Sequence, residues 1–197
     1  MIRLAIASAR GILLGVLLVA STGVTAASAD ALPGDSVYQL SIPMLDQDAK
    51  AFDFASLRGK PRLVTMFYTS CAYMCPLIID TMHMTERELD QTQRAKLSVL
   101  MVSFDAKRDD PAILKAQADK RKIDTGRWTL ARTDAPNVRT LAAVLGIQYR
   151  QLDDGEFNHS SVLILLDADG RIAARSETMG KTDPEFISAI KRVLGEP

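Results

Sequence analysis

Residues 63–76 read LVTMFYTSCAYMCP, an apolar run followed by two cysteines with three residues between them. The run Leu63–Phe67 has the nearly continuous apolar content of a central strand that is covered on both faces. Pro76 suits the first turn of a helix, where backbone amides lack partners in any case. A strand, turn and helix in this order would bring both sulfurs to one edge of the fold, where the helix dipole favours thiolates. Cys71 and Cys75 therefore indicate metal binding or disulfide exchange.

The first 29 residues have the pattern of a secretory signal. Arg3 and Arg10 form a basic start, residues 11–20 are largely apolar, and Ala27-Ser28-Ala29 is a small-residue cleavage signature. An uncleaved anchor is the alternative, because residues 11–29 approach the ~20 residues of a membrane span. In either case we expect an exported protein, in the periplasm or at the outer face of the inner membrane.

The charge balance argues against polyanionic partners. The chain has 24 basic and 24 acidic residues, and residues 1–29 hold two of the basic and none of the acidic ones, which leaves 22 against 24. A domain over residues 30–197 therefore has no basic excess for nucleic acid or for an anionic membrane surface. The sequence also lacks a glycine-rich phosphate loop and a Ser-His-Asp hydrolase signature.

The order of the remaining patterns predicts an α/β fold in a single domain, a thioredoxin-like mixed sheet flanked by helices. Apolar runs predict the strands, Asp-Pro and Asp-Ala-Pro pairs predict helix starts, and Asp167-Ala168-Asp169-Gly170 predicts a hairpin turn. In chain order the expected elements are strand Val37–Leu40, strand Arg62–Phe67, helix Pro76–Gln93, strand Leu97–Phe104, helix Pro111–Arg121, strand Trp128–Leu130, helix Pro136–Gly146, strands Val162–Leu166 and Arg171–Ala174, and a last helix from Pro184.

His159 is a candidate third ligand for a metal. It directly precedes the Val162 strand, whose start faces the cysteine turn in a thioredoxin-like topology. Two thiolates and one imidazole make a three-coordinate site that suits copper. Structural zinc prefers four ligands. The other histidine, His83 in Met82-His83-Met84, is a weaker auxiliary candidate, because Met82 has the spacing of a core residue.

Asp105 ends the Leu97–Phe104 strand, so the topology places it near the cysteines. Its carboxylate is a candidate for tuning the thiolates from outside the ligand set. The alternative is a solvated turn, and Asp109 is interpreted as part of the cap of the next helix.

Two redox families are excluded by spacing. Thioredoxin-type oxidoreductases have two residues between their cysteines and a proline before the facing strand. Here the spacer has three residues, and His159 stands where that proline is expected. The peroxiredoxin pattern places a threonine three residues before the cysteine, but Tyr68 and Ala72 occupy those positions. A structural disulfide remains open, although so short a loop would contribute little stability.

Three segments together resemble the Sco/SenC family of copper-binding thioredoxin-fold proteins. Residues 68–76, YTSCAYMCP, are similar to its Cys-x-x-x-Cys-Pro loop. Residues 102–111, VSFDAKRDDP, resemble its Val-Ser-x-Asp-Pro-x-Arg-Asp-Thr-Pro stretch, and residues 158–160, NHS, resemble its histidine segment. The likeness extends over Leu32–Leu194.

The resemblance implies that Cys71, Cys75 and His159 hold one copper ion, Cu(I) or Cu(II), with Asp105 nearby. It also implies a metallochaperone that helps to mature the dinuclear copper centre of cytochrome c oxidase. Its partners would be a copper-receiving protein such as an oxidase subunit, or another copper chaperone. The alternative is a thiol–disulfide oxidoreductase that uses Cys71 and Cys75 as a redox pair and joins them in a disulfide when oxidised.

The chain departs from the family pattern in three respects. Ala72 replaces a common proline and Tyr73-Met74 replaces an acidic-aliphatic pair, which changes the stiffness, charge and softness of the cysteine loop. Ala106 and Asp110 replace the proline and threonine of the aspartate segment. The changes in the cysteine loop bear on partner and metal preference.

Overall fold

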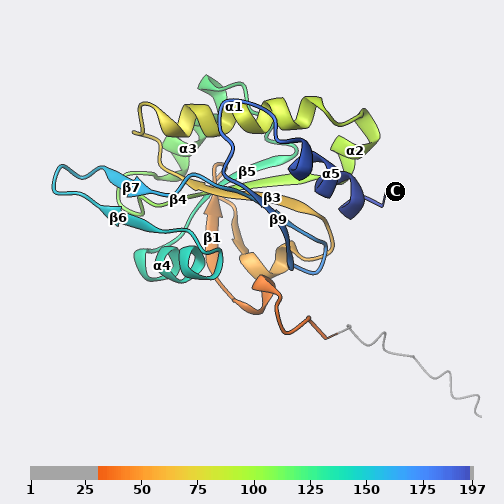
Figure 1. Cartoon of the computed structure of the whole chain (residues 1–197). Helices are drawn as coiled ribbons and strands as arrows, with labels where there is room; N and C mark the ends of the chain where they lie inside the picture. The colour runs from red at the N-terminus through yellow and green to blue at the C-terminus, as the bar shows by residue number, and fades with distance from the viewer. Residues whose placement is uncertain (1–30, 196–197) are drawn as a thin grey trace, which may run out of the picture. The chain divides into compact units, whose positions relative to one another are not determined.

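A seven-stranded mixed sheet forms the centre of the structure (Figure 1). The computed structural model describes residues 31–195, so the predicted signal in residues 1–29 lies outside the described part. A separate two-stranded sheet, β6–β7, lies apart from the seven strands. The sheet order is β2-β1-β5-β4-β3-β8-β9, with bounds β1 Pro43–Asp46, β2 Ala51–Asp53, β3 Arg62–Phe67, β4 Ser98–Ser103, β5 Trp128–Arg132, β6 Tyr149–Gln151, β7 Phe157–His159, β8 Leu163–Leu166 and β9 Ile172–Ser176.

The central strands bring three loops to one edge of the sheet. β3 and β4 are parallel, with Phe67 paired to Ser103, and every residue of both strands is buried. β8 runs antiparallel on the other side of β3, so it starts at the edge where β3 ends. The Thr65 hydroxyl donates to the Val162 carbonyl at this edge, 2.9 Å away. The loops after β3 and β4 and the segment before β8 therefore converge.

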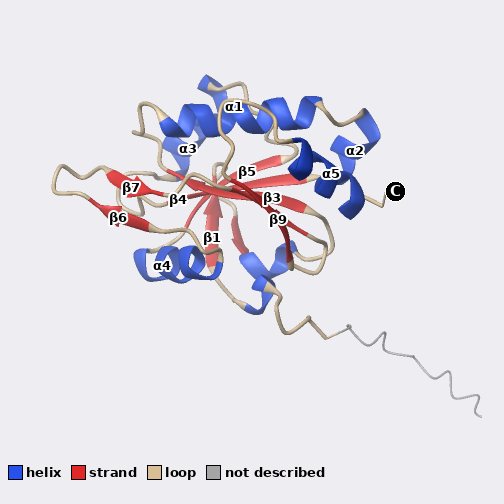
Figure 2. Ribbon diagram, viewed as in Figure 1, coloured by secondary structure: helices blue, strands red, loops and turns tan. Residues whose placement is uncertain are grey.

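Helices cover both faces of the sheet (Figure 2). α1, α3 and α5 lie on one side, and α4 lies on the other with the two 3₁₀ helices. Parallel crossovers β3–α1–β4 and β4–α3–β5 advance in one direction, so a right-handed connection places their helices on the same face. The bounds are η1 Val37–Gln39, η2 Phe54–Leu57, α1 Met74–Arg87, α2 Gln91–Lys96, α3 Pro111–Lys120, α4 Ala135–Val144 and α5 Pro184–Val193.

An aspartate cap combined with a proline begins three of these helices. Asp110, Asp134 and Asp183 are the N-caps of α3, α4 and α5, and each accepts a backbone N–H of the first turn. A proline follows each cap inside the first turn.

Within residues 31–195, no helix combines the length and the apolar character needed to cross a bilayer.

Two predicted elements differ from the structure. The strand expected at Val37–Leu40 is wrong, because η1 forms there and the Ser36 hydroxyl accepts the Tyr38 N–H. The helix expected to run to Gln93 ends at Arg87, and α2 begins afresh behind a capping box between Asp90 and Gln93.

Candidate metal centre

Cys71, Cys75 and His159 form a cluster at the convergent edge of the sheet. One ligand atom from each, two Sγ and one imidazole nitrogen, lies within 4.8 Å of the others. Cys71 is on the loop after β3, Cys75 is in the first turn of α1, and His159 ends β7. The structure thus brings together three predicted ligands that come from three different elements of the chain.

The two thiols differ sharply in proton affinity. The Cys75 thiol donates to Cys71, the Cys75 N–H donates to the Cys71 sulfur at 3.3 Å, and together they lower the pKa of Cys71 to about 4. The same thiol–thiolate hydrogen bond and complete burial raise the pKa of Cys75. The Tyr68 N–H donates to the Cys75 sulfur at 3.5 Å. The pair therefore presents a half-buried thiolate, Cys71, backed by a buried thiol.

The imidazole of His159 is held by its own neighbours. Its Nδ1 lies 3.1 Å from the Ser160 carbonyl oxygen. A carbonyl only accepts, so Nδ1 is the donor in this contact, and Nε2 is the ring nitrogen left for a metal ion. The ring packs on Phe104, with centroids 4.9 Å apart, and on Tyr68, with centroids 5.9 Å apart.

The strand that carries His159 was not predicted. β7 pairs with β6 in a hairpin, with Tyr149 opposite His159. The signal was present, because Asp153-Asp154-Gly155 separates two short runs that contain aromatic residues.

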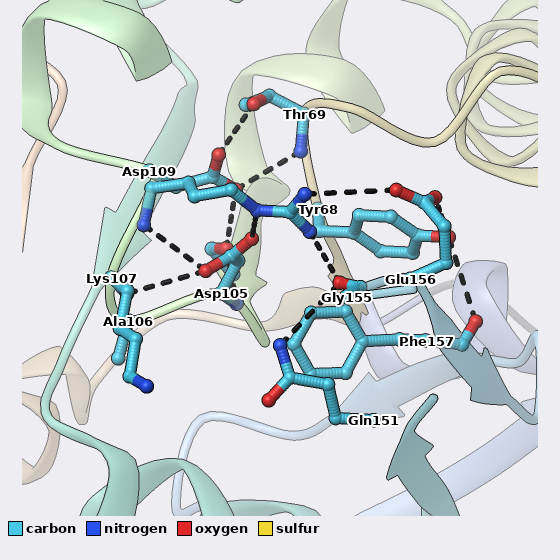
Figure 3. Close-up of polar contacts among 12 residues, drawn as sticks. Tyr68, Thr69, Asp105, Ala106, Lys107, Asp109, Gln151, Gly155, Glu156 and Phe157 are labelled. Atoms are coloured by element: carbon cyan, nitrogen blue, oxygen red, sulfur yellow. Dashed lines mark hydrogen bonds and ion pairs between the residues drawn. The ribbon is translucent and has the colours of Figure 1, made fainter. Parts of the chain in front are cut away.

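Asp105 is buried near the site, and its carboxylate faces an arginine. It accepts the backbone N–H groups of Lys107 and Arg108, at 3.3 and 3.0 Å, and forms an ion pair with the Arg108 guanidinium. Figure 3 shows these contacts beside Tyr68 and the hairpin residues Gly155 and Glu156. The Asp105 carboxylate therefore holds the Arg108 guanidinium, which in turn donates to the Gly155 carbonyl of the hairpin.

Asp109 is a residue that the sequence interpretation placed wrongly. The cap of α3 is Asp110, and Asp109 is only 1% exposed. Its carboxylate accepts hydrogen bonds from the Thr69 N–H at 3.0 Å, from the Thr69 hydroxyl and from the Ser103 hydroxyl. Its charge also contributes to the raised pKa of Cys75. A sequence signal existed, since a helix needs one capping aspartate and the chain supplies two.

His83 takes a packing role. Met82 is fully buried, and the His83 ring stacks on Trp128 with centroids 4.7 Å apart. Within residues 31–195, His83 belongs to no cluster of three potential ligands.

The apex of the cysteine loop is open. Tyr73 is 85% exposed and Met74 38%, although both lie between the two cysteines. The donor set itself, two sulfurs and one imidazole, fits a soft metal ion such as Cu(I). The low pKa of Cys71 also suits attack on a disulfide.

The SCO1/SenC family model matches residues 35–195. An SCO2-like protein of Rickettsia typhi is 26% identical over 131 residues, 65% of this chain and 64% of the relative, so the match spans less than two thirds of that protein.

Solved structures share the fold. Bradyrhizobium japonicum ScoI with copper bound has a TM-score of 0.66 at 24% identity, covering 78% of this chain and 98% of that one. BsSco, a member of the Sco family of cytochrome c oxidase assembly proteins with a disulfide switch, has a TM-score of 0.67 at 19% identity, covering 79% and 92%. The predicted thioredoxin-like α/β fold is confirmed, and the chain belongs to the SCO1/SenC family.

Proposed function

We propose that this protein is a copper-binding metallochaperone of the cell envelope. The observation that carries the proposal is the approach of Cys71, Cys75 and His159 to within 4.8 Å at their ligand atoms. Family membership and the copper-bound relative support copper as the cargo.

The different pKa values of the two cysteine thiols determine how each would take part in copper binding. Cys71 offers a thiolate at neutral pH, whereas Cys75 must lose its proton when a metal binds. His159 supplies a neutral nitrogen and adds no charge. The half-buried thiolate is the first point of contact, and the buried thiol completes the capture.

The recipient we propose is a protein with a dinuclear copper centre such as a cytochrome c oxidase subunit, with another copper chaperone as a further exchange partner. The exposed side chains of Tyr73 and Met74 border the cluster and give a partner apolar contact surface. Residues 1–29 fit an export signal or anchor, with the working domain over residues 30–197 in the periplasm or at the outer face of the inner membrane.

A metal titration tests the proposal. We expect the reduced protein to bind one Cu(I) per monomer in competition with a chromophoric chelator. His159→Ala should weaken binding at least about tenfold, because a donor is lost. His83→Ala is the matched control and should leave affinity unchanged, since His83 packs on Trp128. Undiminished affinity in His159→Ala would remove the imidazole from the site.

A thiol–disulfide reductase is the second candidate, and the low pKa of Cys71 favours it. The Cys71 thiolate would attack a partner disulfide, forming a mixed disulfide and releasing one partner thiolate, which takes up a proton. Cys75, once deprotonated, would then attack the Cys71 sulfur and release the second thiolate. Two electrons pass to the partner, and a Cys71–Cys75 disulfide remains. Cys75→Ser should trap the mixed disulfide, and its absence would count against this activity.

A further inference from the structure

The hairpin that carries His159 depends on side chains for its attachment. β6 and β7 have three residues each and pair only with one another among the described strands. An isolated two-stranded hairpin is marginally stable in water. The position of the imidazole therefore depends on what fastens the hairpin to the rest of the fold.

Arg108 reaches from the segment after β4 to the tip of the hairpin. Its Nη2 donates to the Gly155 carbonyl at 2.6 Å, and its Nη1 lies 3.7 Å from Glu156 Oε1. The Gln151 side chain donates to the same Gly155 carbonyl at 3.4 Å. Figure 3 shows these hydrogen bonds meeting around Gly155.

Glu156 extends the connection to the cysteine loop. Its Oε2 accepts the Tyr68 hydroxyl at 3.0 Å (Figure 3). The Tyr68 side chain is buried, and its N–H donates to the Cys75 sulfur. One chain of contacts, Asp105–Arg108–Glu156–Tyr68, thus joins the aspartate segment, the hairpin and the thiols.

Asp105 holds the guanidinium in place. The Asp105 side chain is 3% exposed and that of Arg108 is 43% exposed, so the ion pair fixes a solvent-reaching arginine to a buried anchor. The fork of an arginine donates in several fixed directions at once, and a lysine cannot reproduce this arrangement.

We infer that Arg108 is a positioning residue for His159: it latches the β6–β7 hairpin against the cysteine loop, and so keeps the imidazole beside the two sulfurs. The inference rests on the proposed metal-binding role of His159. Arg108 itself touches none of the three ligands in the contacts described above.

Two measurements on the full reduced protein test the latch. In Arg108→Ala, hydrogen exchange of the β6 and β7 amides should accelerate, and Cu(I) affinity should fall about tenfold, the scale of lost outer contacts at metal sites. In a His159→Ala background the same substitution should change affinity by less than about twofold, because the ligand it positions is gone. Arg171→Ala is the control, since that exposed arginine pairs with Asp35 away from the site.

Glu156 variants test the same connection without exposing Asp105. Glu156→Ala should behave like Arg108→Ala, whereas Glu156→Gln keeps an acceptor for Tyr68 and should stay within about twofold of wild type. Wild-type affinity in both Arg108→Ala and Glu156→Ala, alongside a weakened His159→Ala, would overturn the latch and leave the metal site intact. An equal loss from Arg108→Ala with and without His159 would also overturn it. If His159→Ala binds Cu(I) with wild-type affinity, the proposed metal site is wrong, and the inference about Arg108, which depends on it, is wrong as well.

Discussion

Asp109 is hydrogen-bonded twice to Thr69, 40 residues earlier in the chain, through the Thr69 backbone N–H and its hydroxyl. The same carboxylate accepts the Ser103 hydroxyl at the end of β4. The loop that carries the cysteines is therefore fixed to the neighbouring strand by one buried carboxylate.

Removing this carboxylate should be costly. Asp109→Ala leaves the buried Ser103 hydroxyl and the half-buried Thr69 groups without their acceptor, and we expect a loss of about 1–3 kcal/mol in the free energy of unfolding, mainly from the buried hydroxyl. Asp110→Ala, the adjacent helix cap, should cost about 1 kcal/mol. Urea unfolding of both variants checks the order, and an Asp109→Ala loss no larger than that of Asp110→Ala would contradict it.

The thiol chemistry should show an unusual pH dependence. Because the pKa of Cys71 is about 4, its thiolate is already fully formed at neutral pH. Iodoacetamide should therefore alkylate it at a nearly constant rate from about pH 6 to about pH 8, whereas an ordinary thiol with a pKa of about 8.5 gains almost tenfold per pH unit. Cys75→Ala removes the main hydrogen-bond donor and should raise the pKa of Cys71. Mass spectrometry of the alkylated site gives the rate, and a steep rise in the wild-type protein would refute the assignment.

Gly170 should resist substitution. Its φ is +84°, and an added Cβ would lie 2.4 Å from Tyr38 Cδ2. Gly170→Ala should destabilise the fold by about 2 kcal/mol or more, because both backbone strain and a clash with a buried ring oppose it. Gly59, with φ +101° and no neighbour within 4 Å, is the matched control for strain alone. Equal losses in thermal unfolding would show that the clash is absent.

The N-cap of α5, Asp183, should make the stability of the fold depend on pH. The Ser176 hydroxyl and the first amides of the helix lower the pKa of Asp183. Because the folded pKa lies below the unfolded value, the stabilisation is present above about pH 4 and is lost as pH falls through the folded pKa. Asp183→Asn should therefore be less stable than wild type at neutral pH, and the gap should close on acidification. A gap that widens below about pH 4 would contradict the sign.

Local patterns account for much of the fold. The apolar runs at β3 and β4 and the Asp-led helix starts are visible in the sequence, because buried strands and capped helices require those residue types. The break between α1 and α2 was missed, since apolar spacing continues while the capping box at Asp90 restarts the helix. η1 was missed because a capping serine outweighed a short apolar run.

The candidate site was likewise predictable from the sequence only in part. The spacing of Cys71 and Cys75 indicates their chemistry directly, and the sheet topology explains why His159 faces them. The sequence shows that one of Asp109 and Asp110 is not needed as the helix cap, but it cannot identify the partners of Asp109 and Arg108, because those partners come from other segments. Thr69 reaches Asp109 through the parallel pairing of β3 and β4, and Gly155 reaches Arg108 through the fold of the hairpin.

The separate two-stranded sheet has an engineering consequence. Cys71 and Cys75 lie on segments that adjoin the central sheet, at the end of β3 and the start of α1. His159 lies on the β6–β7 hairpin, which forms no strand pairs with the seven-stranded sheet. In the proposed site, global stability and ion selectivity would thus depend on different parts of the polypeptide. Redesigning this hairpin, by exchanging the imidazole for a thioether or a carboxylate, is the route to a new ion preference that spares the scaffold.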